Sequence, residues 1–202
     1  MSSTPSSRSI VAAFLGAALI LVATPAVAQA QTPAVAPAAL TPSDIATIMA
    51  ANDGKVGLRN HKSQKYLEPR NAGTAQGTRV VQQSLRPLVR GDLDPLQNWT
   101  VSEVDVWYVF KNVKTTKALG LNNGSTAAGT PAVTATGDGS LNQDWQFRSV
   151  PQYPAGVYHL VNAKDPTKCL GISGASMSND AQAAIFPCDT SNNQGWEVVD
   201  PR

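Results

Sequence analysis

The chain has few of the residues that usually carry catalytic or metal chemistry. Its 202 residues include 2 His and 2 Cys, and charged residues make up 15%. His61 and His159 are not in a metal-ligand spacing, so we expect ordinary surface or strand histidines. No Ser/His/Asp or Cys/His arrangement appears, and no carboxylate pair stands out as a glycosidase dyad. We therefore predict a protein that is not an enzyme and needs no metal or cofactor.

A strong excess of one charge is also absent. The formal net charge at pH 7 is +2, from 16 basic and 14 acidic residues. Bulk charge therefore does not drive binding to nucleic acid or to acidic membranes. No long segment with helical periodicity appears after residue 54, which favours a β architecture for the rest of the chain.

The long apolar run of the chain lies at its N-terminus. Arg8 precedes the run from Ile10 to Val22, which is too short to span a bilayer comfortably. Ala26-Val27-Ala28 or Ala28-Gln29-Ala30 offers a cleavage site of the small-x-small type. We predict a signal peptide over residues 1–30 and a secreted protein without a membrane span after cleavage. A retained membrane anchor is the alternative.

Residues 31–54 are predicted to be a linker that includes a short helix. The uncharged part up to about Leu40 is rich in Ala and Pro and cannot bury a core. Thr41 is a candidate N-cap for a helix that begins at Pro42 and ends before Gly54. The apolar residues expected to dock this helix on the domain are Ile45, Ile48 and Met49.

The remaining residues, 55–202, contain an internal repeat. Three Trp residues each have a Gln two places earlier, and an Asn recurs after 52 and then 50 residues. Such repetition predicts three copies of a unit that is too small to fold alone. We place the copies at about 55–103, 104–150 and 151–202. The repeated residues are Gln97-Asn98-Trp99, Gln143-Asp144-Trp145 and Gln194-Gly195-Trp196, with Asn60, Asn112 and Asn162.

The sequence within these repeats favours strands. Val104–Phe110 and Val157–Val161 are rich in aromatic and β-branched residues. Turn sequences such as Asn122-Asn123-Gly124 and Gly137-Asp138-Gly139 separate the runs. Short strands at regular spacing predict a closed or nearly closed β architecture.

The Gln-x-Trp motif predicts interior residues. Residues i and i+2 of a strand point to one face, so each Gln and Trp should enter the interior side by side. A buried indole N–H needs a partner. The Gln amide can satisfy it or can cross-link neighbouring backbone groups. The predicted core residues of the motifs include Gln97, Trp99, Trp145 and Trp196.

These repeats resemble those of the ricin B-chain type of β-trefoil lectin, a family defined by three Gln-x-Trp repeats of about this length. The run Asn123–Thr130 matches as well. The resemblance covers residues 55–202 and implies an all-β trefoil with pseudo-threefold symmetry, in which three hairpins close a six-stranded barrel. It also implies a disulfide between Cys169 and Cys188, which a secreted chain keeps oxidised. Two free buried thiols are the alternative.

The resemblance further implies a shallow sugar pocket on each repeat. In the family an early Asp, a Gln and an aromatic residue on the next hairpin, and an Asn before the Gln-x-Trp motif hold the sugar. Hydroxyls need polar partners, and the pyranose ring needs a flat apolar platform. The matching positions are Glu68, Gly120 and Gly171 for the Asp; Val81, Val133 and Ala184 for the Gln; Gln83, Ala135 and Phe186 for the aromatic residue; and Leu96, Asn142 and Asn193 for the Asn.

No repeat keeps the whole set, and the third keeps the most. Asp189 or Asp180 is expected to replace its missing acid. In the opposite interpretation, all these residues are core or turn residues of pockets that no longer bind. The candidate sugar-binding residues are Phe186, Asn193, Gln194 and Asp189 in the third repeat, Asn142 and Gln143 in the second, and Glu68 in the first.

We therefore expect a secreted module that binds polysaccharide or glycoconjugate without catalysis. The first repeat is about six residues longer than the others, and the extra residues fall near Arg86–Pro95. Loops on rigid scaffolds often carry function. The second hypothesis is accordingly a protein-interaction trefoil, such as a secreted hydrolase inhibitor, that uses this loop. A scaffold or toxin-accessory subunit is a third hypothesis.

Two N-glycosylation sequons are present, Asn98-Trp99-Thr100 and Asn123-Gly124-Ser125. Asn98 adjoins a core Trp, so Asn123 is the better acceptor candidate.

Overall fold

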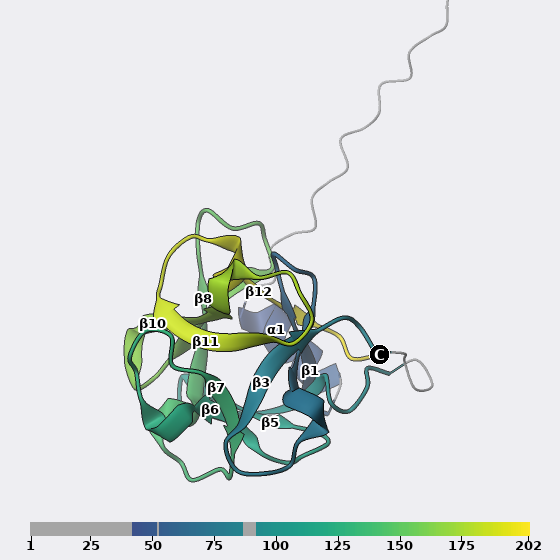
Figure 1. Cartoon of the computed structure of the whole chain (residues 1–202). Coiled ribbons are helices and arrows are strands. Elements are labelled where there is room, and N and C mark those ends of the chain that lie inside the picture. Colours follow the sequence, from purple (N-terminus) through teal and green to yellow (C-terminus); the bar gives the residue numbers. More distant parts are fainter. Residues whose placement is uncertain (1–41, 52, 87–91) are drawn as a thin grey trace, which may run out of the picture. The chain divides into compact units, whose positions relative to one another are not determined.

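The computed structural model describes residues 42–51, 53–86 and 92–202 (Figure 1). The predicted signal peptide, the first part of the predicted linker and residues 87–91 of the long loop lie outside the described residues. Within those residues, no helix combines the length and the hydropathy that crossing a bilayer requires.

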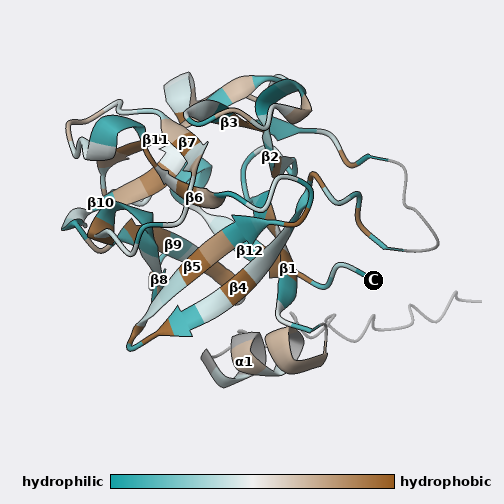
Figure 2. Cartoon of the chain, turned by 90° about the horizontal axis from the view of Figure 1, so that it is seen from below, coloured by the Kyte–Doolittle hydropathy of each residue, from teal (hydrophilic) through white to brown (hydrophobic). Residues whose placement is uncertain are grey.

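The predicted short helix is present as α1 (Pro42–Ala51). It lies beside the first strand of the first repeat (Figure 2). Its Met49 packs against the core. Gly54 follows the helix with a φ of +71° and donates its N–H to the Met49 carbonyl at 2.6 Å. Thr41 and the side chains of Ile45 and Ile48 lie outside the description.

Each repeat contributes four strands, as the family resemblance implies. The first repeat contains β1 (Lys55–Asn60), β2 (Tyr66–Pro69), β3 (Thr78–Gln83) and β4 (Asn98–Val104). The second contains β5 (Trp107–Asn112), β6 (Ala118–Leu121), β7 (Ala132–Ala135) and β8 (Asp144–Ser149). The third contains β9 (Val157–Asn162), β10 (Asp165–Ile172), β11 (Ala181–Pro187) and β12 (Trp196–Val199).

Six of these strands close a ring. β1 pairs with β4, β4 with β5, β5 with β8, β8 with β9, β9 with β12, and β12 with β1, always antiparallel. Closure removes the exposed edges that an open sheet would present. The other six strands form the hairpins β2–β3, β6–β7 and β10–β11. β3 joins the hairpins by pairing with both β7 and β11 (Figure 1). This is the six-stranded barrel with three hairpins that the resemblance implies.

The three motif Trp residues fill the barrel. All are fully buried and belong to one hydrophobic cluster that all three repeats share. Their indole N–H groups donate to backbone carbonyls of the hairpins and not to the Gln side chains. The donor–acceptor pairs are Trp99 with Leu67 at 3.2 Å, Trp145 with Leu119 at 3.0 Å and Trp196 with Leu170 at 2.8 Å.

The Gln residues of the motifs do not lie in strands, so the prediction that Gln and Trp share a strand face is wrong. Gln143 and Gln194 end the 3-10 helices η3 (Leu141–Gln143) and η5 (Asn192–Gln194), because their N–H groups close turns onto the residue three places earlier. All three Gln side chains are nevertheless buried. The Gln amides were predicted either to accept from the indole N–H groups or to cross-link backbone groups, and they cross-link backbone groups. They donate to backbone carbonyls at or just after the end of the second strand of each hairpin, from Gln97 to Ser84, from Gln143 to Thr136 and from Gln194 to Pro187.

The repeated Asn residues join one repeat to the next. Each is fully buried, and its amide N–H group donates to the two carbonyls that flank the motif Gln of the neighbouring repeat. Because the first repeat bonds in this way to the third, the ring of repeats is closed. The bonds run from Asn60 to Asn193 (2.9 Å) and Gly195 (3.3 Å), from Asn112 to Leu96 (2.8 Å) and Asn98 (3.4 Å), and from Asn162 to Asn142 (3.1 Å) and Asp144 (3.3 Å).

Candidate functional site

A pocket of about 330 Å³ lies on the third repeat. It is lined by Phe186 at the end of β11, by Asp189 in the loop that follows, and by Asn193 and Gln194 of η5. The structure therefore brings together the four residues that the sequence assigned to this repeat.

Asp189 is the acid that belongs to this pocket. Its Oδ1 accepts the Ser191 N–H at 2.8 Å and the Ser191 hydroxyl, while Oδ2 takes no hydrogen bond within the described part of the chain. One oxygen is thus fixed and the other can accept from a ligand. Asp180 does not line the pocket. Its Oδ1 accepts from Gln83 Nε2 at 3.0 Å and lies 3.7 Å from Arg70 Nε, both in the first repeat.

The two η5 residues have different roles. Asn193 is half-buried and donates through Nδ2 to the Ile172 carbonyl at 3.3 Å, which leaves its Oδ1 as an acceptor. Gln194 is buried, and both ends of its amide hold the neighbouring loop. Its Nε2 donates to the Pro187 carbonyl at 3.0 Å, and its Oε1 accepts the Asp189 N–H at 3.1 Å. Gln194 therefore shapes the pocket, because both polar atoms of its buried amide are bonded to the backbone beside the pocket.

Gly120 and Gly171, at the family's acid position, have little room for a side chain. A Cβ on Gly171 would lie 3.0 Å from Gln194 Cγ and 3.3 Å from the Asn193 carbonyl oxygen. A Cβ on Gly120 would lie 2.9 Å from Gln143 Cγ. The motif Gln therefore lies close to both glycines, and in the third repeat the pocket's carboxylate comes from Asp189, on the wall formed by the loop after β11.

The predicted disulfide is confirmed and supports this wall. Cys169 on β10 is bonded to Cys188, which stands between Phe186 and Asp189 in the sequence. A ring nitrogen of His159 and the two cysteine sulfurs lie within 4.8 Å of one another. Because the two sulfurs are bonded to each other, they are not available as thiolate ligands.

Two side chains from β9 and the loop before it brace the same wall. The Tyr153 hydroxyl donates to the Ser191 carbonyl at 2.7 Å, and His159 Nε2 lies 2.8 Å from the Asp189 carbonyl oxygen. A carbonyl only accepts, so His159 carries a proton on Nε2. Burial lowers the pKa of His159 and favours the neutral ring. Burial, together with the charge of Asp189, raises the pKa of Tyr153 to about 12.

The second repeat carries a larger pocket of about 680 Å³ that lacks an aromatic wall. It is lined by the predicted Asn142 and Gln143, with Ala135 where the third repeat has Phe186. Asp138 Oδ1 accepts the Ser140 hydroxyl at 2.6 Å and the Ser140 N–H at 3.0 Å. These bonds lower the pKa of Asp138 and keep it ionised.

Asp138, Ser140 and Ser191 are pocket residues that the sequence reasoning missed, and it also missed Lys164. A signal for the first three was present. Asp-x-Ser recurs five residues before the motif Gln in Asp138-Gly139-Ser140 and Asp189-Thr190-Ser191. Lys164 comes from the third repeat and donates to the Gly124 carbonyl at 2.6 Å, a contact between repeats that has no local signature.

The corresponding place on the first repeat is filled by an ion pair. Glu68 is fully buried, and its carboxylate accepts Arg86 Nε at 2.8 Å and Arg86 Nη2 at 2.5 Å. Gln97 Nε2 adds a third bond at 3.0 Å. The hydrogen bond to Glu68 raises the pKa of Arg86. Glu68 therefore has its charge partner within the fold, and Leu96, at the family's Asn position, is a buried apolar residue.

His61, which the sequence analysis expected to be an ordinary histidine, lies at the surface. His61 is a surface turn residue whose Nδ1 lies 3.0 Å from Glu197 Oε1.

The two sequons differ in exposure. Asn98 is only 6% exposed, whereas Asn123 is exposed at the rim of the second-repeat pocket. Of the two sequons, Asn123 is therefore the accessible one.

The closed ring of three equivalent repeats, each with a position for a pocket, matches a known family. The family model described as "Ricin-type beta-trefoil lectin domain-like" matches residues 45–135, 95–183 and 141–202. The chain belongs to this family. No match was found among curated proteins.

Solved structures with the same fold include a designed protein, a lectin and an enzyme. ThreeFoil, a designed threefold symmetric protein, is 29% identical with a TM-score of 0.66, over 73% of this chain and 99% of its own. The Macrolepiota procera ricin B-like lectin, solved in complex with lactose, is 13% identical with a TM-score of 0.61, over 73% and 95%. The exo-β-1,3-galactanase 1,3Gal43A from Clostridium thermocellum is 22% identical with a TM-score of 0.64, over 72% of this chain and 30% of its own. The likeness to the last two is one of fold.

Proposed function

We propose that this protein binds polysaccharide or glycoconjugate through the third-repeat pocket, without catalysis. The observation that carries the proposal is the meeting of Phe186, Asp189 and Asn193 in one pocket. An aromatic ring beside a carboxylate and an amide suits a pyranose, which has one apolar face and a rim of hydroxyls. Membership of a lectin-like family and the lactose complex of the Macrolepiota procera lectin support the same conclusion.

Each pocket residue has a distinct part in this binding. The half-buried ring of Phe186 is the platform for the C–H face of the sugar. Asp189 Oδ2 and Asn193 Oδ1 accept hydrogen bonds from sugar hydroxyls, and Ser191 holds the carboxylate in position. No covalent step is involved, so the sugar is bound and released unchanged.

The three repeats are proposed to differ in strength. The second-repeat pocket offers Asp138 and Asn142 but has Ala135 in place of a ring, so it binds more weakly. The first-repeat position is occupied by the ion pair of Glu68 with Arg86 and contributes no site.

A glycan titration tests the proposal. We expect a positive signal from a panel of galactosides, xylans and glucans, followed by a saturable isotherm in calorimetry. Phe186→Ala should abolish most of that signal. Met177→Ala is the matched control, because it removes an exposed apolar side chain of the same repeat that does not line the pocket. Silence across the whole panel would contradict the proposed function.

Secretion is proposed on two grounds. The N-terminal pattern over residues 1–30 fits a cleaved signal peptide, and the Cys169–Cys188 disulfide suits an oxidising compartment. N-terminal sequencing of the protein from culture medium should give a chain that begins after Ala28 or Ala30. Recovery of the intact N-terminus in the membrane fraction would favour the anchor instead.

A further inference from the structure

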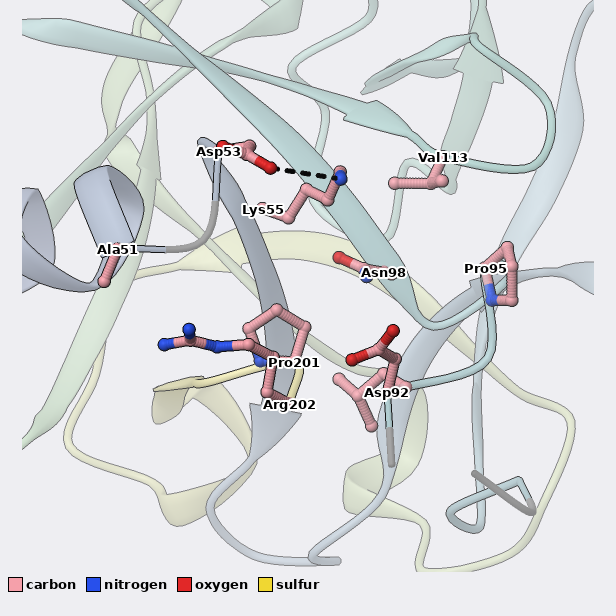
Figure 3. Close-up of a pocket in the computed structure, with 10 residues that line it drawn as sticks. Ala51, Asp53, Lys55, Asp92, Pro95, Asn98, Val113, Pro201 and Arg202 are labelled. Carbon is pink, nitrogen blue, oxygen red and sulfur yellow. Dashed lines mark ion pairs between the residues drawn. The ribbon is translucent and has the colours of Figure 1, made fainter. Parts of the chain in front are cut away.

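A pocket of about 570 Å³ lies where three segments outside the threefold pattern meet (Figure 3). These are the turn after α1 with Asp53, the end of the long loop with Asp92, and the C-terminal segment with Arg202. Both cations that line this pocket have an acidic neighbour. Lys55 Nζ lies 3.9 Å from Asp53 Oδ2, and Arg202 Nη2 lies 3.3 Å from an oxygen of Asp200. The cations of this pocket are therefore paired within the fold.

Lys164 in the second-repeat pocket has no such partner. It lines that pocket, is exposed, and forms no ion pair within the described part of the chain. Its Nζ donates to the Gly124 carbonyl at 2.6 Å, which uses one of its three N–H donors. The space that a Cβ on Gly124 would occupy lies 3.2 Å from Lys164 Nζ and 3.7 Å from Asn142 Oδ1. The ammonium and the Asn142 amide therefore border the same space.

A second lysine shows that the repeat sets this placement. Lys62 and Lys164 each stand two residues after the repeated Asn. Lys62 Nζ donates to the Ala175 carbonyl at 2.8 Å, so it reaches the neighbouring repeat in the same way as Lys164. In both cases the acceptor is the last residue of a 3-10 turn, η2 (Asn122–Gly124) or η4 (Ser173–Ala175). Ala175 lines the third-repeat pocket but Lys62 does not, so of these two cations it is Lys164 that becomes part of a pocket.

The second-repeat pocket is also rich in amide donors. The side chains of Asn122 and Asn123 line it and make no hydrogen bond among the described residues. Gln76, from the first repeat, accepts the Thr136 N–H through Oε1 at 2.8 Å, which leaves its Nε2 as a donor. None of the described residues that line this pocket is aromatic. A ligand group that only accepts hydrogen bonds matches such a pocket, and a carboxylate or a sulfate is a group of this kind.

Asp138 is the acid among the residues that line this pocket. Its Oδ1 accepts from Ser140, so Oδ2 is the oxygen left for a sugar hydroxyl. The carboxylate would repel an anion placed next to it, so the binding mode has to keep the two apart. The pocket has room for this, because its volume of about 680 Å³ is roughly twice the 330 Å³ of the third-repeat pocket. A sugar acid can thus direct its hydroxyls to Asp138 and its carboxylate to Lys164.

We propose that the second-repeat pocket binds a sugar that carries an anionic group, and that Lys164 selects for this group. The inference rests on the proposed function, since it assigns a substrate class to the weaker of the two sites. The anion is a uronate carboxylate or a sulfate ester, and both present acceptor oxygens to the ammonium. The third-repeat pocket has the ring of Phe186 and no cation among the described residues that line it, so it remains the site for an uncharged sugar.

The first experiment is a solution NMR titration of the full chain with the methyl glycosides of galacturonic and glucuronic acid. The methyl ester of each compound is the uncharged control, because it keeps the shape of the sugar. We expect saturable shifts of the side-chain amides of Gln76, Asn122 and Asn142 with at least one acid, and an affinity about fivefold above that of its ester. About 0.5 M NaCl should remove most of the difference, because salt screens exposed charges.

The methyl galactoside that carries a sulfate ester on its primary hydroxyl distinguishes the two anions. Tighter binding of this compound than of either uronate favours a sulfated glycan as the ligand. Tighter binding of a uronate favours a glycan that contains sugar acids.

Variants at the repeated lysine test the assigned contact. Lys164→Gln keeps a donor at the same place but removes the charge, so the affinity for the preferred anion should fall about fivefold while that for the uncharged ester stays the same. Lys114→Gln is the matched control. Lys114 stands two residues after Asn112, is exposed and does not line this pocket, so its substitution should change neither affinity. Urea midpoints of both variants show whether loss of the contact with Gly124 has also changed stability.

Four results would overturn this inference. They are equal affinity for acid and ester, an unchanged preference in Lys164→Gln, shifts with the acids that map to the third-repeat pocket, and no binding of any of the three anionic sugars. If uncharged glycans still bind at Phe186, such a failure leaves the proposed function intact. If no sugar of either kind binds, both proposals fail.

Discussion

Single polar residues in the interior decide which repeats keep a pocket. Glu68 is the one acid at the family's sugar-binding position, and the fold buries it with Arg86 and Gln97 as its partners. The acid at the position that the family resemblance assigned to sugar binding thus fixes the start of the long loop.

Removal of the Arg86 guanidinium should leave this carboxylate buried and unpaired. We predict that Arg86→Met lowers the free energy of unfolding by about 2 kcal/mol, less than for a fully buried pair because Arg86 is partly exposed. Urea unfolding measures the change. Arg79→Met is the matched control, since Arg79 is exposed and makes only a long contact of 3.4 Å to Gln182. Equal effects of the two substitutions would contradict the role assigned to the ion pair.

His159 should make stability depend on pH. Burial lowers its pKa in the folded state below the ordinary value of 6.5, so the unfolded chain takes up a proton first as the pH falls. Stability should therefore decline from about pH 7 downward through 6.5 and level off below the lowered folded-state pKa. In His159→Gln this part of the decline should be missing. Urea midpoints at several pH values between these limits measure it, and parallel curves for the two proteins would contradict the prediction.

The sequence predicted which residues line the third-repeat pocket. It did not predict which of their polar atoms are already hydrogen-bonded within the fold. Phe186 and Asn193 were found by position relative to the motif. The structure shows that the Gln194 amide is bonded to Pro187 and Asp189, and that Asp189 rather than Asp180 lines the pocket. Both facts depend on how the folded chain places these residues, which the sequence pattern does not state.

The loop after β11 is the element on which the candidate sugar site depends. It carries Asp189 and Ser191, and it is held by the disulfide, by Tyr153 and by His159. No equivalent bridge exists in the other two repeats, since the chain has only two Cys.

Loss of the disulfide should affect this element more than the barrel. The double variant Cys169→Ala with Cys188→Ala should lose roughly 3 kcal/mol of stability, as expected for closure of a loop of this size. Because the loop also positions Asp189, glycan affinity should fall by several-fold even where the protein is fully folded. Calorimetry at a temperature well below the unfolding transition separates the two effects. Unchanged glycan affinity would place the ligand elsewhere.

At the level of elements, the sequence predicted the presence of short strands but not the conformation of the motif Gln residues. Runs of aromatic and β-branched residues and the turn residues between them indicated the strands, because these signals are local. The run Val104–Phe110 is nevertheless not one strand, since Val104 ends β4, Trp107 begins β5, and a turn with Asp105 at a φ of +54° separates them. The 3-10 turns that carry Gln143 and Gln194 depend on backbone bonds to Ser140 and Ser191, and nothing in the Gln-x-Trp spacing distinguishes them from the start of a strand.

The whole molecule combines one shared core with pockets that are built separately. All three Trp residues and the hairpin Leu residues belong to one cluster. Repetition therefore predicted three copies that share one core, since copies of a small unit must bury their apolar faces together. The trefoil arrangement itself was implied by the resemblance to the ricin B-chain family. The 570 Å³ pocket was not predictable, because it lies where the asymmetric segments meet.

Separate pockets imply that the number of sugar sites can be changed without altering the core. Ala135→Phe should place a ring in the second-repeat pocket and raise its glycan affinity about tenfold, which is about 1.4 kcal/mol. The stoichiometry measured by calorimetry should then approach two. Ala184→Phe is a contrasting control, because Ala184 is fully buried and a larger side chain there should destabilise the fold. A stoichiometry that stays at one in Ala135→Phe would show that the second pocket lacks more than a ring.

The pairing of β1 with β12 places the first and last strands of the trefoil edge to edge, with Leu58 opposite Val198. The ring of strands should therefore form whichever repeat comes first in the sequence. A short tether between Arg202 and Asp53, together with a new opening in the exposed turn at Asp105, would give a circular permutant whose middle repeat runs first. Such rearranged chains lack α1 but should form the same ring of twelve strands, and display scaffolds could be opened at whichever repeat leaves the chosen pocket farthest from the fusion point.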